Sequence, residues 1–246
     1  MVTRSNPADA VAPPTRVAAA DGKAAAIDAA QAKSAIAELD KALRGSDTAL
    51  KLKAIQMHGA IADAEIAHLL GRGARDKEPA IQGAAIQALR WLEQPEALKE
   101  LHAIARSEKA LRKDPVAYAR LLQAIGQHGD ASSIPFLVDD VTTVPEHVVL
   151  EARILGLGRI RSVAAVEALV ELMKVTGAQR IQNLMPDFRL ALARLTGVDK
   201  GQSQPLWQEW WNAERVKLRV EPGEPELALE LAHARVQGRC DRGNAH

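Results

Sequence analysis

The chain has 246 residues, of which 47% are hydrophobic and only 3% aromatic, and its formal net charge is +1. Because 32 basic residues nearly balance 31 acidic ones, the charge excludes a strong general attraction to nucleic acid or anionic membranes. No apolar run approaches the roughly 20 residues that span a bilayer, and the single Cys240 cannot form an internal disulfide. The first residues contain no hydrophobic signal core. We therefore expect a cytoplasmic protein, with an exported form as the alternative if a signal preceded residue 1.

Abundant Ala and Leu, with few β-branched runs, favour helices along most of the chain. Residues 1–30 are rich in Ala and Pro and predict a disordered leader. Apolar periodicity and breaker residues then predict five helix pairs. In chain order these are 31–44 with 47–58, 64–72 with 78–92, 95–107 with 114–128, 132–141 with 145–160, and 162–176 with 180–196. Asp47, Ser132 and Ser162 are candidate N-caps, and Pro186 should kink the last helix or delay its start.

The second helices of these pairs resemble one another. Aligning Leu89, Ile125, Leu157 and Leu195 gives spacings of 36, 32 and 38 residues, and Ala54-Ile-Gln matches Ala85-Ile-Gln at a spacing of 31. A repeat of this length with two helices per unit is typical of an α-solenoid. We therefore predict an all-α fold, a solenoid of about five helix pairs.

The stretch Arg153-Ile-Leu-Gly-Leu-Gly-Arg-Ile-Arg-Ser-Val-Ala-Ala-Val-Glu-Ala-Leu169 carries a resemblance to a known family. It resembles the bacterial HEAT-like repeats of the phycobilisome-lyase type. In these repeats a helix ends in Leu-Gly, and a short loop connects it to an apolar helix. The resemblance extends over about residues 31–196. It implies HEAT-like helix pairs, and a chromophore lyase-type activity as one alternative function.

Three of the four tryptophans lie close together near the C-terminal end of the repeats. Trp207, Trp210 and Trp211 follow Pro205 at positions i, i+3 and i+4, which share one side of a helix. We predict that this helix caps the last repeat, whose apolar face would otherwise be bare. The alternative is an aromatic clamp for a base, a sugar or a quaternary amine. The solenoid with its cap is assigned to 31–220, and 221–246 to a flexible tail with a short helix near 227–236.

The fourth tryptophan belongs to a polar stripe on the second helices. In the alignment, Trp91, Gln127 and Arg159 occupy equivalent positions, and so do Gln87 and Gln123. Arg120 lies one helical turn before Gln123. Second helices line the concave side of such solenoids, where aromatic and arginine side chains are common anchors. We therefore predict a non-enzymatic scaffold that binds another protein along this stripe. The alternative is that Trp91 packs between repeats.

Other functional classes have weaker support in the sequence. The later second helices contain seven arginines and four carboxylates. This excess of positive charge leaves a nucleic-acid-binding or DNA-glycosylase-like groove as an alternative function. Ordinary solvent-exposed helix faces also account for these charges. Only His147 and Glu151 form a plausible pair of metal ligands, so no metal, cofactor or catalytic residue is predicted. We expect His58, His102 and His128, which lie near helix ends, to stabilise helix dipoles.

Overall fold

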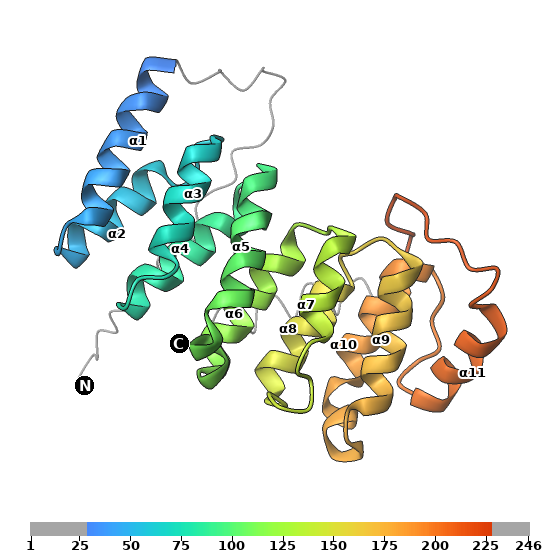
Figure 1. The fold of residues 1–246 in the computed structure, drawn as a ribbon. Coiled ribbons are helices and arrows are strands. Elements are labelled where there is room, and N and C mark those ends of the chain that lie inside the picture. Colours follow the sequence, from blue (N-terminus) through green and yellow to red (C-terminus); the bar gives the residue numbers. More distant parts are fainter. Residues whose placement is uncertain (1–28, 228–246) are drawn as a thin grey trace, which may run out of the picture.

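The computed structural model describes residues 29–227, which are helical without any strand (Figure 1). The α-helices and the two 3₁₀ segments, η1 and η2, follow in chain order: α1 (Ala29–Arg44), α2 (Thr48–His58), α3 (Ala64–Gly73), α4 (Pro79–Trp91), α5 (Pro95–Ser107), η1 (Lys109–Lys113), α6 (Pro115–Gln127), η2 (Ala131–Ser133), α7 (Ile134–Val138), α8 (His147–Leu157), α9 (Val163–Val175), α10 (Ala178–Thr196) and α11 (Gln204–Glu214). Within residues 29–227, no helix has both the length and the apolar character needed to cross a membrane.

The helices form two layers. The first helices of the pairs (α1, α3, α5, α7 and α9) lie in one layer with α11, and the second helices (α2, α4, α6, α8 and α10) lie in the other (Figure 1). Each second helix contacts the second helix of the next pair, and one continuous apolar core runs from Leu39 to Trp211. The predicted α-solenoid is therefore confirmed.

Local chemistry explains most helix boundaries. The carboxylates of Asp47 and Asp114 accept hydrogen bonds from the first backbone N–H groups of α2 and α6, and the Ser162 hydroxyl accepts one from Ala165 N in α9. Ser132 is not a cap, because its own N–H donates to the Asp130 carboxylate within η2. Helix α10 begins at Ala178 and continues through Pro186, so the proline does not delay its start.

The prediction of a helix over 132–141 is wrong, because α7 ends at Val138. The fully buried Arg153 of α8 donates from Nη1 to the carbonyl oxygen of Leu137, at 2.8 Å, in the only turn of α7. Beyond it, Asp140 has a positive φ of 52°, and Arg112 forms ion pairs with Asp139 and Asp140. Side chains from η1 and α8 thus hold this segment outside the helix, a tertiary effect that helical periodicity does not reveal.

Glycines bring the second helices close together. A Cβ atom on Gly126 of α6 would lie 2.3 Å from the Cα of Gly156 in α8. A Cβ on Gly158 would lie 2.8 Å from the Cβ of Ala191, and one on Gly59 would lie 3.0 Å from the Cβ of Ala88. A contact of 2.3 Å is closer than real Cβ atoms come, so α6 and α8 pack backbone against backbone at Gly126 and Gly156. The other two glycines leave room for the Cβ atoms of Ala191 and Ala88.

A buried histidine links α5 to α7. His102 stacks on Phe136 with ring centroids 4.2 Å apart, and its Nε2 lies 3.0 Å from the Ser133 hydroxyl. Burial, together with the positive charge of Arg106, lowers the His102 pKa to about 4, and burial also lowers the His128 pKa. His102 lies in the middle of α5 and not at its C-terminal end, so the dipole interpretation is wrong for this histidine. His128 is the C-cap residue of α6, and its Nε2 lies 3.1 Å from the Leu89 carbonyl oxygen. His58 instead lies 3.2 Å from the Glu38 carboxylate.

We expect His102 to make the fold sensitive to acid. Its pKa is lower in the folded chain than the value of about 6.5 for an unfolded histidine. The unfolded chain therefore binds the extra proton first, so the free energy of unfolding falls as the pH drops from about 6.5 towards 4, by up to about 1.4 kcal/mol per pH unit. Urea titrations of wild type and His102→Gln at several pH values test this. An equal pH slope in the two proteins would contradict it.

The solenoid ends on α11, which packs against α9. Trp207 is fully buried and donates from Nε1 to the Gly201 carbonyl at 2.9 Å, and its ring meets Trp210 edge-on, with centroids 5.7 Å apart. Trp211 is also buried. Two of the three indoles are thus buried where α11 packs against the last pair, and the cap stays a prediction that Trp207→Ala tests.

The chain after α11 returns to the last repeat. Arg161 donates to the carbonyl oxygens of Arg194, at 2.8 Å, and of Glu221, at 2.6 Å. Pro225 lies beside Gly197. These contacts extend past residue 220, where the sequence predicted the flexible tail to begin. The short helix predicted near 227–236 and the leader over 1–30 fall outside the described residues, apart from residues 29, 30 and 227.

Candidate partner-binding surface

Acidic residues are distributed unequally between the two layers. Helices α2, α4 and α6 contain neither Asp nor Glu. The first helices α1, α3 and α5 do contain them, and these carboxylates connect neighbouring repeats: Asp40 lies 2.6 Å from Arg72, and Glu100 lies 2.8 Å from His68 and 3.2 Å from Arg75. We call the solvent-exposed side of α2, α4 and α6 the acid-free face.

The predicted stripe lies on this face along α4 and α6. Trp91 is 59% exposed, so its indole is not buried between repeats, and the guanidinium of Arg90 lies 5.0 Å from its ring centroid. Gln87 and Arg120 are exposed, whereas Gln123 and Gln127 are half-buried. An exposed indole with an arginine over its ring presents both an apolar face and a positive charge to a partner.

The stripe does not continue onto α8 as the sequence suggested. Arg159 lies two residues beyond the last residue of α8, after Gly158, and is half-buried. The position equivalent to Arg120 on this helix is Ala152, which is fully buried. The structure therefore brings Gln87, Trp91, Arg120, Gln123 and Gln127 onto neighbouring helices and leaves Arg159 apart from them.

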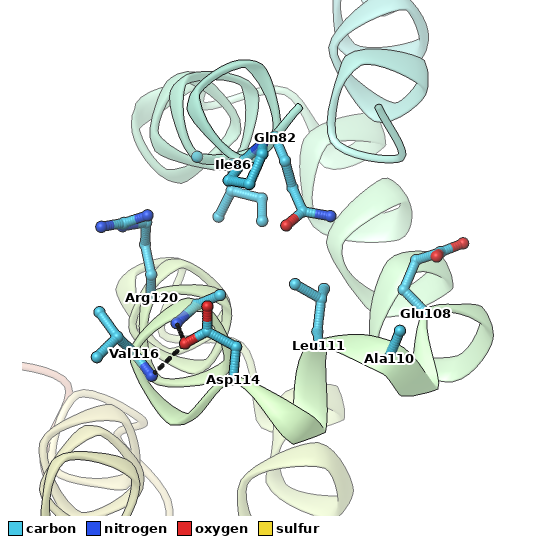
Figure 2. A pocket seen from close by; sticks show the side chains of 11 residues that line it. Gln82, Ile86, Glu108, Ala110, Leu111, Asp114, Val116 and Arg120 are labelled. Atoms are coloured by element: carbon cyan, nitrogen blue, oxygen red, sulfur yellow. Dashed lines mark hydrogen bonds between the residues drawn. The ribbon is translucent and has the colours of Figure 1, made fainter. Parts of the chain in front are cut away.

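A cavity of about 330 Å³ opens between the N-terminal ends of α4 and α6, with η1 beneath it. Figure 2 shows Gln82 of α4 and Leu111 of η1 pointing toward one another across this space. Asp114 also lines the cavity, but its carboxylate accepts the N–H groups of Val116 and Ala117, at 3.0 and 3.1 Å (Figure 2). The other lining residues are Pro79, Gly83, Ile86, Glu108, Ala110 and Arg120. The cavity is large enough for one partner side chain, and its walls are mainly apolar.

Arg120 occupies the edge of this cavity because α4 has no side chain at Gly83. Its Nη1 atom lies 2.8 Å from the position that a Cβ on Gly83 would take. The guanidinium thus lies between α4 and α6 while its side chain stays exposed, and no carboxylate of the described residues pairs with it. An exposed cation beside an apolar cavity suits a partner with a carboxylate next to an apolar side chain.

Sequence reasoning missed the part of this face on α2. Leu50 and Met57 are 58% and 59% exposed, and Lys53 and Gln56 between them are exposed as well. The match of Ala54-Ile-Gln to Ala85-Ile-Gln already made Gln56 equivalent to Gln87, so the signal was present in the repeat alignment.

The arginine excess on the later second helices is smaller than the sequence indicated. Arg153 is buried, Arg189 binds both carboxylate oxygens of Asp199 at 2.8 and 2.6 Å, and Arg194 pairs with Glu224. The bond from Arg189 lowers the pKa of Asp199. A second cavity at the starts of α8 and α10 carries both signs of charge, since Glu146, His147 and Arg180 line it. Nowhere in residues 29–227 do three His, Cys, Asp or Glu side chains gather as a metal site would require.

Residues 36–114, from α1 to the residue before α6, match the family of HEAT repeats. Within this range the repeats are similar to HEAT repeats. The match covers less than half of the chain, but the same two-layer packing continues beyond it through α10. No curated protein matches the chain in sequence. HEAT repeats commonly mediate protein–protein interaction. Of the acid-free face, α2 and α4 lie within the matched residues and α6 lies beyond them.

Proposed function

We propose that this HEAT-like protein is a non-enzymatic interaction module that binds another protein along the acid-free face. The observation that carries the proposal is Trp91, which is 59% exposed, pairs with Arg90, and lies on the same helix as the cavity residues Gln82 and Ile86. The exposure of a large indole to water is unfavourable, so a partner that covers this side chain gains binding free energy. The solenoid is held by its own core, so little ordering is required of it on binding.

The charges of this face favour a protein over a nucleic acid. Lys53, Arg90 and Arg120 are few beside the apolar side chains Leu50, Met57, Trp91 and Val116, which are all more than half exposed. Nucleic-acid grooves instead depend on many phosphate contacts. The residues 153–169 that resemble phycobilisome-lyase repeats lie outside the matched family range, so we do not propose a lyase activity.

Replacing Trp91 by alanine should weaken partner binding without unfolding the chain. We expect the dissociation constant of a captured partner to rise at least tenfold, about 1.4 kcal/mol, as for an aromatic anchor. The melting temperature should stay close to that of wild type, because Trp91 is 59% exposed. The measurement is affinity capture from extract, followed by titration calorimetry with the captured protein.

Leu206→Ala is the matched control, since Leu206 is 49% exposed on α11, far from α4. It should leave capture unchanged. Partners that bind wild type and Trp91→Ala equally well would show that the interaction uses another surface.

A further inference from the structure

Three glutamines form a row across the acid-free face. Gln56, Gln87 and Gln123 occupy equivalent positions on α2, α4 and α6, at spacings of 31 and 36 residues. Gly59 lies beside Ala88, which places Gln56 and Gln87 within a helical turn of one another, and the guanidinium of Arg120 on α6 reaches Gly83 of α4. None of the three side-chain amides forms a hydrogen bond with another residue of the described range. We call these residues the glutamine row.

A positively charged side chain lies one helical turn before the glutamine row on α2 and on α6. Lys53 precedes Gln56 by three residues, and Arg120 precedes Gln123 by three. The position between them on α4 is the small Ala84. Lys53 and Arg120 are exposed, and within residues 29–227 no carboxylate pairs with either of them. The face therefore offers two positive charges at its sides and three amides across its middle.

We infer that the acid-free face binds an extended, acidic protein segment that also carries apolar side chains. The inference rests on the proposed function and names the class of partner. Side-chain amides both donate and accept, so the glutamine row can hydrogen-bond to the N–H and C=O groups of an extended backbone. Lys53 and Arg120 bind carboxylates, and Arg120 can do so with two N–H groups at once.

Distances set the length of this segment. Packed helices lie about 8–10 Å apart, so α2 and α6 are about 20 Å apart across α4, which an extended chain covers in roughly six residues. Two acidic residues about five or six positions apart would therefore reach Lys53 and Arg120 together. An apolar side chain between or beside them can enter the cavity next to Ile86, or cover Met57 and Trp91.

Two carboxylates line the cavity beside the acid-free face, and their positions are compatible with an acidic partner segment. Asp114 accepts both N–H groups at the start of α6 with Oδ1, and the helix dipole there stabilises its charge. Glu108 lies at the η1 end of the cavity and accepts from the Ser107 hydroxyl at 3.2 Å, whereas Arg120 belongs to α6 and leans toward Gly83 of α4. The exposed acids Asp47, Glu78 and Glu93 lie at or just beyond the ends of α2 and α4, so the helical part of the face carries Lys53 and Arg120 without a carboxylate of its own.

The experiment selects partners from a random dodecapeptide library displayed on phage, with the full chain immobilised. We expect the selected peptides to be enriched in Asp and Glu, with two of them five or six positions apart, and to contain an apolar residue. A synthetic selected peptide should bind the double variant Lys53→Glu/Arg120→Glu at least tenfold more weakly. A version of that peptide with Lys in place of its acids should bind the double variant better than it binds wild type.

Lys41→Glu on the exposed side of α1 is the charge control and should leave the affinity unchanged. Gln87→Ala/Gln123→Ala should also weaken binding, whereas Gln31→Ala on α1 should not. Selected peptides without acidic enrichment that still depend on Trp91 would overturn this inference and leave the proposed function standing. Peptides that depend on none of these residues would overturn both. Tighter binding of a 20-nucleotide single-stranded DNA than of any selected peptide would assign the face to nucleic acid instead.

Discussion

Trp207→Ala should destabilise the protein by about 3–5 kcal/mol, the range for removing a buried tryptophan. The indole is fully buried at the junction of α11 with α9, donates to the Gly201 carbonyl and meets Trp210 edge-on. Its loss leaves a cavity under the cap and an unpaired carbonyl oxygen. Urea unfolding followed by circular dichroism gives the free-energy difference directly.

The neighbouring position provides the control for this substitution. Leu206 is 49% exposed on the same helix, so Leu206→Ala should cost less than about 1 kcal/mol. Because the ends of a solenoid can unfold separately from its middle, hydrogen exchange should show the loss of protection in Trp207→Ala concentrated in α9, α10 and α11. Wild-type stability in Trp207→Ala, together with loss of a small ligand, would instead favour the aromatic clamp.

Most of the fold could be predicted because repeated local signals agree with one another. Breaker residues and apolar periodicity place α5 at its observed bounds, and they place α3 and α4 within a residue of theirs. The predicted caps Asp47 and Ser162 bond to the first N–H groups of their helices. These signals act within one turn of the chain, where sequence and structure are directly linked.

The departures arise where distant residues decide the local structure. Helix α7 stops at Val138 because Arg153 and Arg112, which are distant in sequence, bond to its end and to the following loop. Burial lowers the pKa of His102, which stacks on Phe136 and lies beside Ser133 of the next pair. The return of Glu221 and Pro225 to the last repeat depends on Arg161 and Gly197. Periodicity and capping rules contain no information on such contacts.

The proposed binding surface could be predicted only in part. The repeat alignment placed Gln87, Trp91, Arg120, Gln123 and Gln127 on neighbouring second helices, and their role in binding stays a prediction. It failed at Arg159, since α8 ends earlier than the periodicity indicated. The cavity was not predictable, because it depends on how η1 approaches the starts of α4 and α6.

Gly126→Ala should destabilise the protein by at least about 2 kcal/mol, although alanine favours a helix over glycine by about 1 kcal/mol. The new Cβ would lie 2.3 Å from the Cα of Gly156 and 3.2 Å from its carbonyl carbon. Both are backbone atoms, so only a separation of α6 from α8 relieves the clash, and that separation leaves gaps along the junction. Thermal and urea unfolding of the purified variant measure the loss.

Gly83→Ala is the matched control, because Gly83 also lies inside a second helix. There the nearest atom to the new Cβ is Nη1 of Arg120, at 2.8 Å, the end of a flexible and exposed side chain that can move aside. The helix preference should then dominate, so Gly83→Ala should gain roughly 0.5–1 kcal/mol. If both variants gained stability, the second helices would not be in backbone contact at Gly126. Opposite signs would show that this contact, rather than helix propensity, determines how closely α6 and α8 pack.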